Sequence, residues 1–316
     1  MKVLVSPWWL ATGIADLRSS FPQVEIATAN TPADTAREIA DADVVFGNID
    51  GAGFAAAKQL RWIQSYGAGV EWIARVPELI SSNVVVTNTR GAHAATIAEH
   101  AFGMLLTLTR GLRTLGDQQR ERVWRRPTGV HFVGLSGLTL GVVGLGRIGS
   151  AIAQRGHGFD MHVIAVDTND VPRASYIEEF WNLDGLPKLL TKSDVLAIAT
   201  PLTPETRGMF GPTQLAMLRP SAFLVLVSRG GIVDQPALCQ ALAEGRLAGA
   251  AIDVTDPEPL PAEHELWGAP NLIISPHCSG SSRQTDDRVW GIFKENLARY
   301  LAGQPLNNLV DKRRGY

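Results

Sequence analysis

Short apolar runs alternate with longer alanine-rich and charged segments through the first ninety residues. The intervening segments, such as Pro32–Ala42 and Phe54–Leu60, have the spacing of helices. Strands that alternate with helices indicate βαβ units and a parallel sheet. We therefore predict a first parallel sheet, whose strands lie at Lys2–Ser6, Val24–Thr28, Val44–Gly47, Trp62–Ser65 and Val84–Thr87.

The pattern changes at Thr96, where a long apolar segment runs to Leu106. Thr96 and Glu99 have the spacing of a capping box, which predicts a helix that starts here and is buried on most faces. An arginine-rich polar stretch, Arg120–Arg126, comes next, and the tail Asp286–Leu301 is an amphipathic helix. Between them lies a second α/β series, with strands at Thr139–Val143, His162–Asp167, Val195–Thr200, Ala222–Val227, Ala248–Val254 and Asn271–Ser275.

Composition narrows the class of protein. A chain of 316 residues has room for two domains. Its formal charge of −2 gives no electrostatic reason to expect nucleic acid or an anionic membrane as a partner. The two cysteines are too few for a disulfide scaffold or a cysteine-rich metal centre, and no metal is expected. With no membrane-length apolar run and no secretory signal, we expect a cytoplasmic protein.

A glycine loop follows the first strand of the second series. Gly144, Gly146 and Gly149 have the spacing G-x-G-x-x-G, and Asp167 ends the next predicted strand. This arrangement is typical of dinucleotide binding, with the pyrophosphate at the helix N-terminus. The Asp167 carboxylate would bind the adenosine ribose hydroxyls and repel a 2′-phosphate. Because Thr168–Asp170 contains no arginine, we predict NAD as the cofactor in preference to NADP.

Three polar residues follow later strands of the same series, namely Arg229, Glu258 and His277. Ligands of open α/β sheets bind beyond the carboxyl ends of the strands, so all three should lie at the edge that carries the glycine loop. Each residue alone is as easily explained by a helix cap, a solvated turn or a packed loop. Together they suit a 2-keto acid: the guanidinium binds the carboxylate and carbonyl, and the histidine, oriented by the glutamate, exchanges the alcohol proton.

These residues resemble the D-isomer-specific 2-hydroxyacid dehydrogenases, over nearly the whole chain. The matching segments are Asn88 with Ala98–His100, Gly144–Gly149, Pro201–Thr206, Arg229–Asp234, Asp253–Pro259 and Ser275–His277. The resemblance implies that Arg229, Glu258 and His277 are the catalytic residues. It also implies that the N–H groups of Ala68 and Gly69 bind the substrate carboxylate.

The resemblance further implies the cofactor contacts. Arg147 and Ile148 would lie at the pyrophosphate, Thr200 and Pro201 beside the adenosine, and Asp253 at the nicotinamide carboxamide. The reaction implied is hydride transfer between NAD(H) and C2 of a small 2-keto or D-2-hydroxy acid, such as glyoxylate, hydroxypyruvate or pyruvate.

The family fold has two doubly wound parallel-sheet domains. A Rossmann cofactor domain, expected at 99–285, is inserted into a flavodoxin-like substrate domain, expected at 1–98 and 286–316. Homodimerisation through the cofactor domain is a further expectation from the resemblance.

Two positions depart from the family pattern, and both leave the choice of substrate open. Leu226 stands where the family often has asparagine, and Glu71-Trp72 stands where it usually has aspartate. Weaker candidates for the substrate pocket are Trp8, Trp9, Tyr66, Arg90 and Arg283. We interpret Cys278, next to His277, as a packing residue, because no base is placed to activate it.

Two other functions remain possible at this point. The same family includes non-enzymatic NAD-sensing corepressors, which share the three polar residues, although this chain has no disordered tail of the kind they carry. Formate dehydrogenases are similar but have glutamine where Glu258 stands, which disfavours them.

Overall fold

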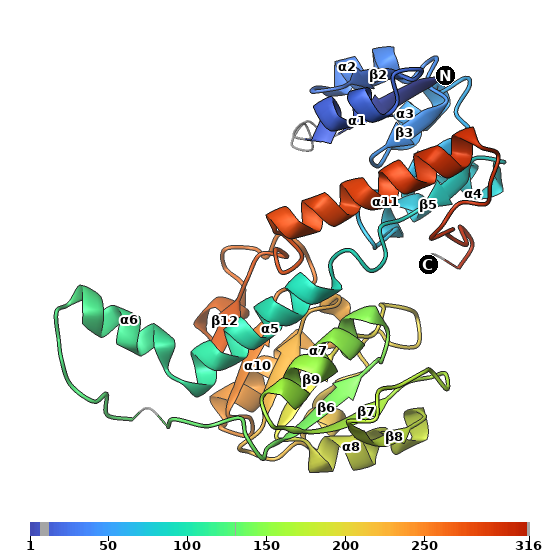
Figure 1. Ribbon diagram of the computed structural model, residues 1–316. Coiled ribbons are helices and arrows are strands. Elements are labelled where there is room, and N and C mark those ends of the chain that lie inside the picture. Colours follow the sequence, from blue (N-terminus) through green and yellow to red (C-terminus); the bar gives the residue numbers. More distant parts are fainter. Residues whose placement is uncertain (7–12, 130, 315–316) are drawn as a thin grey trace. The chain divides into compact units, whose positions relative to one another are not determined.

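The computed structural model describes residues 1–6, 13–129 and 131–314. The chain divides into two compact units, one of Met1–His93 with Ser282–Tyr316 and the other of Ala94–Ser281 (Figure 1). These breaks fall five and four residues before the expected ones at 98/99 and 285/286. We describe each unit by itself.

The first unit contains a five-stranded sheet in which every pair of neighbours is parallel. The order is β2-β1-β3-β4-β5, so the direction of winding reverses beside β1, as in flavodoxin-like sheets. Each strand lies inside a predicted apolar run and is shorter than that run by one residue. The strands are β1 (Lys2–Val5), β2 (Glu25–Thr28), β3 (Val44–Phe46), β4 (Trp62–Gln64) and β5 (Val85–Thr87).

Side chains on alternate positions of these strands enter two cores, one on each face of the sheet. Val3 and Val5 join the core that includes Phe46 and Phe293, while Leu4 joins the other. The Phe293 ring of the C-terminal helix stacks on Phe46 with centroids 4.3 Å apart. The helices of this unit are α1 (Ile14–Ser20), α2 (Pro32–Glu38), α3 (Gly51–Ala56), α4 (Pro77–Ser81) and α11 (Arg283–Leu301), with a 3-10 turn η2 (Glu71–Arg75).

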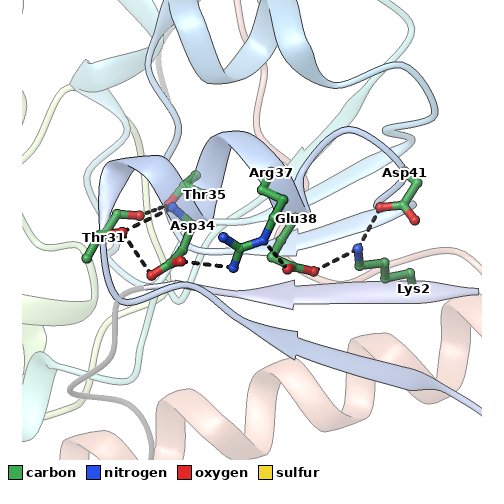
Figure 2. A network of polar contacts seen from close by, with 7 residues as sticks. All are labelled: Lys2, Thr31, Asp34, Thr35, Arg37, Glu38 and Asp41. Carbon is green, nitrogen blue, oxygen red and sulfur yellow. Dashed lines mark hydrogen bonds and ion pairs between the residues drawn. The ribbon is translucent and has the colours of Figure 1, made fainter.

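A polar network ties the start of β1 to α2 and the turn after it (Figure 2). Thr31 caps the helix by accepting the Asp34 N–H at 3.1 Å. The Lys2 ammonium contacts Glu38 at 3.0 Å and Asp41 at 2.6 Å. The hydrogen bond to Asp41 is the main reason that the pKa of Lys2 is raised.

The second unit contains a seven-stranded, wholly parallel sheet of order β12-β11-β10-β9-β6-β7-β8. The winding reverses between β6 and β9, which is the Rossmann arrangement with one added strand. The strands are β6 (Thr139–Val143), β7 (His162–Val166), β8 (Ile177–Trp181), β9 (Val195–Ile198), β10 (Phe223–Leu226), β11 (Gly249–Ile252) and β12 (Leu272–Ile274).

Helices cover both faces of this sheet. Residues of α5 share one core with Val142 and Val225, whereas Leu238 of α10 shares the opposite core with Val143 and Leu226. The helices are α5 (Ala94–Thr109), α6 (Leu112–Arg120), α7 (Arg147–Gly158), α8 (Leu186–Lys192), α9 (Pro212–Leu215) and α10 (Gln235–Ala243), with 3-10 turns η3 (Leu183–Gly185), η4 (Gly230–Ile232) and η5 (Glu265–Gly268).

The capping box predicted at Thr96 is wrong. Helix α5 begins at Ala94, so Thr96 lies inside its first turn. Glu99 instead accepts a hydrogen bond from Arg155 of α7 at 2.9 Å. Strand β8 and helix α6 were not expected, because β8 is a half-buried edge strand with two glutamates and α6 buries no residue. Among the described residues, we find no helix with the length and apolar character needed to span a membrane.

Candidate active site

The predicted site residues of the second unit lie at one edge of its sheet. Because all seven strands are parallel, their carboxyl ends point to the same side, and the loops that follow them meet there. The residues at this edge, in chain order of the strands they follow, are Gly144, Asp167, Thr200, Pro201, Arg229, Asp253, Glu258 and His277.

The glycine loop has the geometry that a dinucleotide requires. Gly144 has φ +88°, and a Cβ on Gly149 would lie 1.9 Å from the Gly144 carbonyl oxygen, so the turn and the helix packing both need glycine. A Cβ on Gly146, in contrast, would meet open space. Gly146 is also the N-cap of α7 and supplies no capping side chain, which leaves the first N–H groups of this twelve-residue helix for an anion. Arg147 is exposed and Ile148 is half-buried in the same turn.

Asp167 closes the loop from the neighbouring strand. Its carboxylate accepts the Leu145 N–H at 2.7 Å and the Asn169 N–H at 3.0 Å. The side chain remains half-exposed at the end of β7. A carboxylate with two backbone donors still has lone pairs for ribose hydroxyls.

Thr200 and Pro201 follow β9 and flank the same loop. A Cβ on Gly144 would come within 3.0 Å of the Thr200 backbone, so the two segments are in close contact. Among the described residues, the buried Thr200 hydroxyl makes no hydrogen bond. An unsatisfied buried hydroxyl beside the glycine loop is consistent with a ligand that supplies the missing partner.

The side chains of His277 and Glu258 are in direct contact at the site. The His277 Nδ1 lies 2.8 Å from Glu258 Oε2, and both side chains are partly exposed to solvent. The second glutamate oxygen accepts the Thr255 N–H at 3.0 Å, which fixes the carboxylate plane. Because an ionised carboxylate only accepts hydrogen bonds, Nδ1 carries a hydrogen and Nε2 is directed away from the glutamate.

Arg229 is positioned by a close contact between two loops. A Cβ on the next residue, Gly230, would lie 2.1 Å from the Thr255 carbonyl group, so the arginine loop packs directly against the loop that carries Glu258. The Gln235 side chain binds both the N–H and the carbonyl of Asp256, at 2.9 and 2.7 Å. The half-buried Arg229 donates to the Ser228 carbonyl at 2.7 Å.

Asp253 is fully buried. Its carboxylate accepts the Ser275 hydroxyl at 2.6 Å, the Cys278 N–H at 3.0 Å and the Ser279 N–H at 2.9 Å. His100 of α5 reaches the same group through Ser275, with Nε2 2.8 Å from the serine oxygen. Ser275 and His100 have no predicted role beyond their place in the family motifs, since only the folded chain brings them to Asp253.

Ala68 and Gly69 belong to the first unit, in the loop that follows β4. The carbonyls of Tyr66 and Gly67 accept from Thr89, and the Ala68 carbonyl accepts from the Asn88 amide at 2.8 Å. In the part of the chain that the structure describes, the N–H groups of Ala68 and Gly69 make no hydrogen bond. They are therefore available to a carboxylate.

The weaker candidates for the substrate pocket lie in different environments. Trp8 and Trp9 lie outside the described residues. Tyr66 packs against the first core, and Arg90 is exposed. Arg283 is the first residue of α11, whose cap is Ser282.

Two of the three residues that depart from the family pattern, Leu226 and Trp72, pack in or against a core. Leu226 is buried in the sheet core. Glu71 begins the 3-10 turn η2, and Trp72 packs against the core of its unit. Burial raises the pKa of the Cys278 thiol above its usual value, which keeps it protonated and agrees with a packing role.

Two glycine substitutions should separate binding from folding. Gly146→Ala adds a methyl group where only a ligand would stand, so we expect weaker dinucleotide binding, by tenfold or more, with an unchanged melting temperature. Gly149→Ala forces Cβ into a backbone carbonyl and should lower the melting temperature as well. A fluorescence titration with NADH measures the change in affinity, and thermal unfolding measures the change in melting temperature. Unchanged NADH affinity in Gly146→Ala would show that the dinucleotide does not lie on this turn.

The chain is similar to a known protein family over most of its length. Residues 102–279 match the family model described as D-isomer specific 2-hydroxyacid dehydrogenase, NAD binding domain. A glyoxylate reductase of Korarchaeum cryptofilum is 36% identical over 269 residues, which cover 84% of this chain and 80% of the relative.

Two solved structures are similar over almost their full length. A D-isomer specific 2-hydroxyacid dehydrogenase family protein of Aeromonas salmonicida is 33% identical with a TM-score of 0.87, covering 98% of this chain and 99% of that one. An NADPH-dependent glyoxylate/hydroxypyruvate reductase of Sinorhizobium meliloti, solved with NADP and sulfate, is 26% identical with a TM-score of 0.84, covering 100% and 99%. The chain belongs to the D-isomer specific 2-hydroxyacid dehydrogenases, enzymes that interconvert 2-keto and 2-hydroxy acids with a nicotinamide cofactor.

Proposed function

We propose that the protein reduces a small 2-keto acid of the glyoxylate, hydroxypyruvate or pyruvate type with NADH. The observation that carries this proposal is the contact of 2.8 Å between His277 and Glu258 at the edge that holds the glycine loop. A histidine oriented through Nδ1 by a carboxylate presents Nε2 as a proton donor. The bound nicotinamide supplies the hydride.

His277, Glu258 and Arg229 each have one role in the proposed reduction. His277, in its protonated form, donates the Nε2 proton to the C2 carbonyl oxygen as hydride adds to C2, and the neutral ring then recovers a proton from solvent. Glu258 keeps the ring oriented through its contact with Nδ1. Arg229 binds the carboxylate and polarises the carbonyl with its forked guanidinium.

The substrate carboxylate has a second set of donors in this proposal, the N–H groups of Ala68 and Gly69. Thr89 and Asn88 already hold the carbonyls of the loop Tyr66–Ala68, so the loop need not reorganise to present these donors. Preorganised donors lose little free energy on binding a charged group. We assign the first unit to the substrate and the second unit to the cofactor on this basis.

A panel of 2-keto acids tests the activity. We expect NADH oxidation with glyoxylate or hydroxypyruvate, and a loss of about 10²–10⁴-fold in kcat for His277→Ala, because a general acid contributes that much. His162→Ala is the matched control. His162 and Glu178 form an exposed pair with the same Nδ1–carboxylate distance of 2.8 Å, but this pair lies away from the site. If NADH binds but no keto acid is reduced, the protein is a binding protein such as an NAD-sensing corepressor.

We propose NAD as the preferred cofactor, although the Sinorhizobium meliloti relative uses NADPH. The support is the half-exposed Asp167 carboxylate at the end of β7. The nearest following arginine, Arg173, contacts Asp170 at 2.7 Å and lies over the Phe180 ring, 4.4 Å from its centroid. A 2′-phosphate would therefore meet a negative group at the strand end and an arginine that is already engaged.

Cofactor choice gives a direct prediction. Wild-type kcat/KM should be higher with NADH than with NADPH, and Asp167→Ala should shift this ratio toward NADPH by about tenfold, since removing one close charge repulsion changes binding by about 1 to 2 kcal/mol. Asp184→Ala, which removes an exposed carboxylate in the turn η3, should shift it less. An equal or better rate with NADPH in the wild-type enzyme would contradict the assignment.

We also propose that the protein forms a homodimer through an arm of the second unit, residues 110–129 with 131 and 132. Helix α6 in this arm buries no residue, and it continues from the end of α5 and projects away from the seven-stranded sheet (Figure 1). Trp124 is fully exposed, with Leu115 and Phe132 exposed near it around a common hollow. Exposed apolar patches of this kind are typical of protein interfaces.

Charge points to a second copy as the partner of the arm. Residues 110–126 contain six arginines against one aspartate and one glutamate, a net charge of +4. The whole chain carries −2, so the rest of the molecule is net −6. A basic arm on an otherwise acidic chain is complementary to another copy of that chain.

The proposed dimer interface on the arm can be tested by measuring the oligomeric state. In sedimentation velocity we expect a wild-type dimer, and a monomer for Leu115→Glu with Trp124→Glu, because both place charge in the apolar contact. The control is Trp267→Glu, at an exposed tryptophan outside the arm, which should leave the dimer intact. A monomeric wild-type protein, or a dimer that survives the double substitution, would refute this interface.

A further inference from the structure

Three consecutive backbone N–H groups converge on one residue. The N–H of His277 donates to the Asp253 carbonyl at 2.8 Å. The next two, of Cys278 and Ser279, donate to the two oxygens of the Asp253 carboxylate at 3.0 and 2.9 Å. Successive N–H groups that line a concave turn form an anion site, and here the anion is a side chain of the same unit.

The backbone of His277 depends on such an anchor. Its φ is +51°, a left-handed conformation that is unfavourable for a residue with a Cβ. The residue is also exposed, so no surrounding core holds it in place. The hydrogen bonds to Asp253 are what oppose relaxation of this turn to an ordinary conformation.

Asp253 is itself fixed in position by its surroundings. Asp253 has no exposed surface and follows β11, a strand whose four residues are all buried. Ser275 donates its hydroxyl hydrogen to the carboxylate at 2.6 Å, and His100 Nε2 lies 2.8 Å from the serine oxygen and 3.8 Å from the carboxylate. A buried carboxylate with this set of donors has a fixed position and orientation.

We propose that Asp253 is a positioning residue for the proton donor: it fixes the left-handed turn at His277 while Glu258 fixes the ring, so that Nε2 has one direction. The proposal rests on the proposed role of His277. It is distinct from the nicotinamide contact that the family resemblance implies for Asp253, because it acts through the backbone N–H groups of His277, Cys278 and Ser279, which donate to the Asp253 carbonyl and to both carboxylate oxygens.

Asp253→Asn in the full-length enzyme separates these roles. The amide cannot accept all the bonds that the carboxylate accepts, so the turn should relax and kcat should fall by roughly 10- to 100-fold, the scale of a misplaced catalytic group. The dissociation constant for NADH should stay unchanged. Asp194→Asn is the matched control, since Asp194 accepts the Thr139 N–H at 2.9 Å before β9, at the opposite edge of the sheet, and its loss should not alter kcat.

A double substitution distinguishes positioning from general stabilisation. In a His277→Ala background, Asp253→Asn should cause no further loss of kcat, because its effect acts through His277. A further loss of the same size as in the wild-type background would overturn the proposal. So would weakened NADH binding with kcat intact, which would assign Asp253 to the nicotinamide. Full activity in His277→Ala alone would instead refute the proposed function.

Hydrogen exchange tests the geometry without any substitution. In the wild-type protein, the amide hydrogens of His277, Cys278 and Ser279 should exchange slowly although His277 lies on an exposed loop. Exchange of the Cys278 and Ser279 amides at the rate of an unprotected chain would overturn the proposal, even if Asp253→Asn does not fold.

Discussion

Parallel pairing of the strands is the constraint on which the site depends. In the seven-stranded sheet every strand runs in the same direction, so every loop that follows a strand arrives at one edge. Residues as far apart in sequence as Gly144 and His277 become neighbours of one edge for this reason alone. The chemistry then requires only that the right residue type follows each strand.

Close backbone packing converts this common edge into a defined geometry. Gly149 lets α7 approach the glycine loop, and Gly230 lets the arginine loop approach the loop that carries Glu258. At both points a Cβ would lie about 2 Å from a backbone carbonyl, a distance that no side chain can occupy. Small residues therefore set the positions of the charged ones.

Much of this arrangement could be predicted from the sequence, because it rests on local signals. Buried parallel strands appear as short apolar runs, and the polar residues directly after them are visible in the chain. Strand β8 was not predicted, because an edge strand that contains two glutamates does not form a short apolar run. The link from His100 through Ser275 to Asp253 joins residues up to 175 positions apart, and only the folded chain brings them together.

The first unit is built from the two ends of the chain, whereas the second is continuous from Ala94 to Ser281. The stacked pair of Phe46 and Phe293 joins those two ends inside one core. During synthesis from the N-terminus, the second unit is therefore complete while the first still lacks its longest helix. The order in which the two units can mature is thus opposite to the order in which they begin.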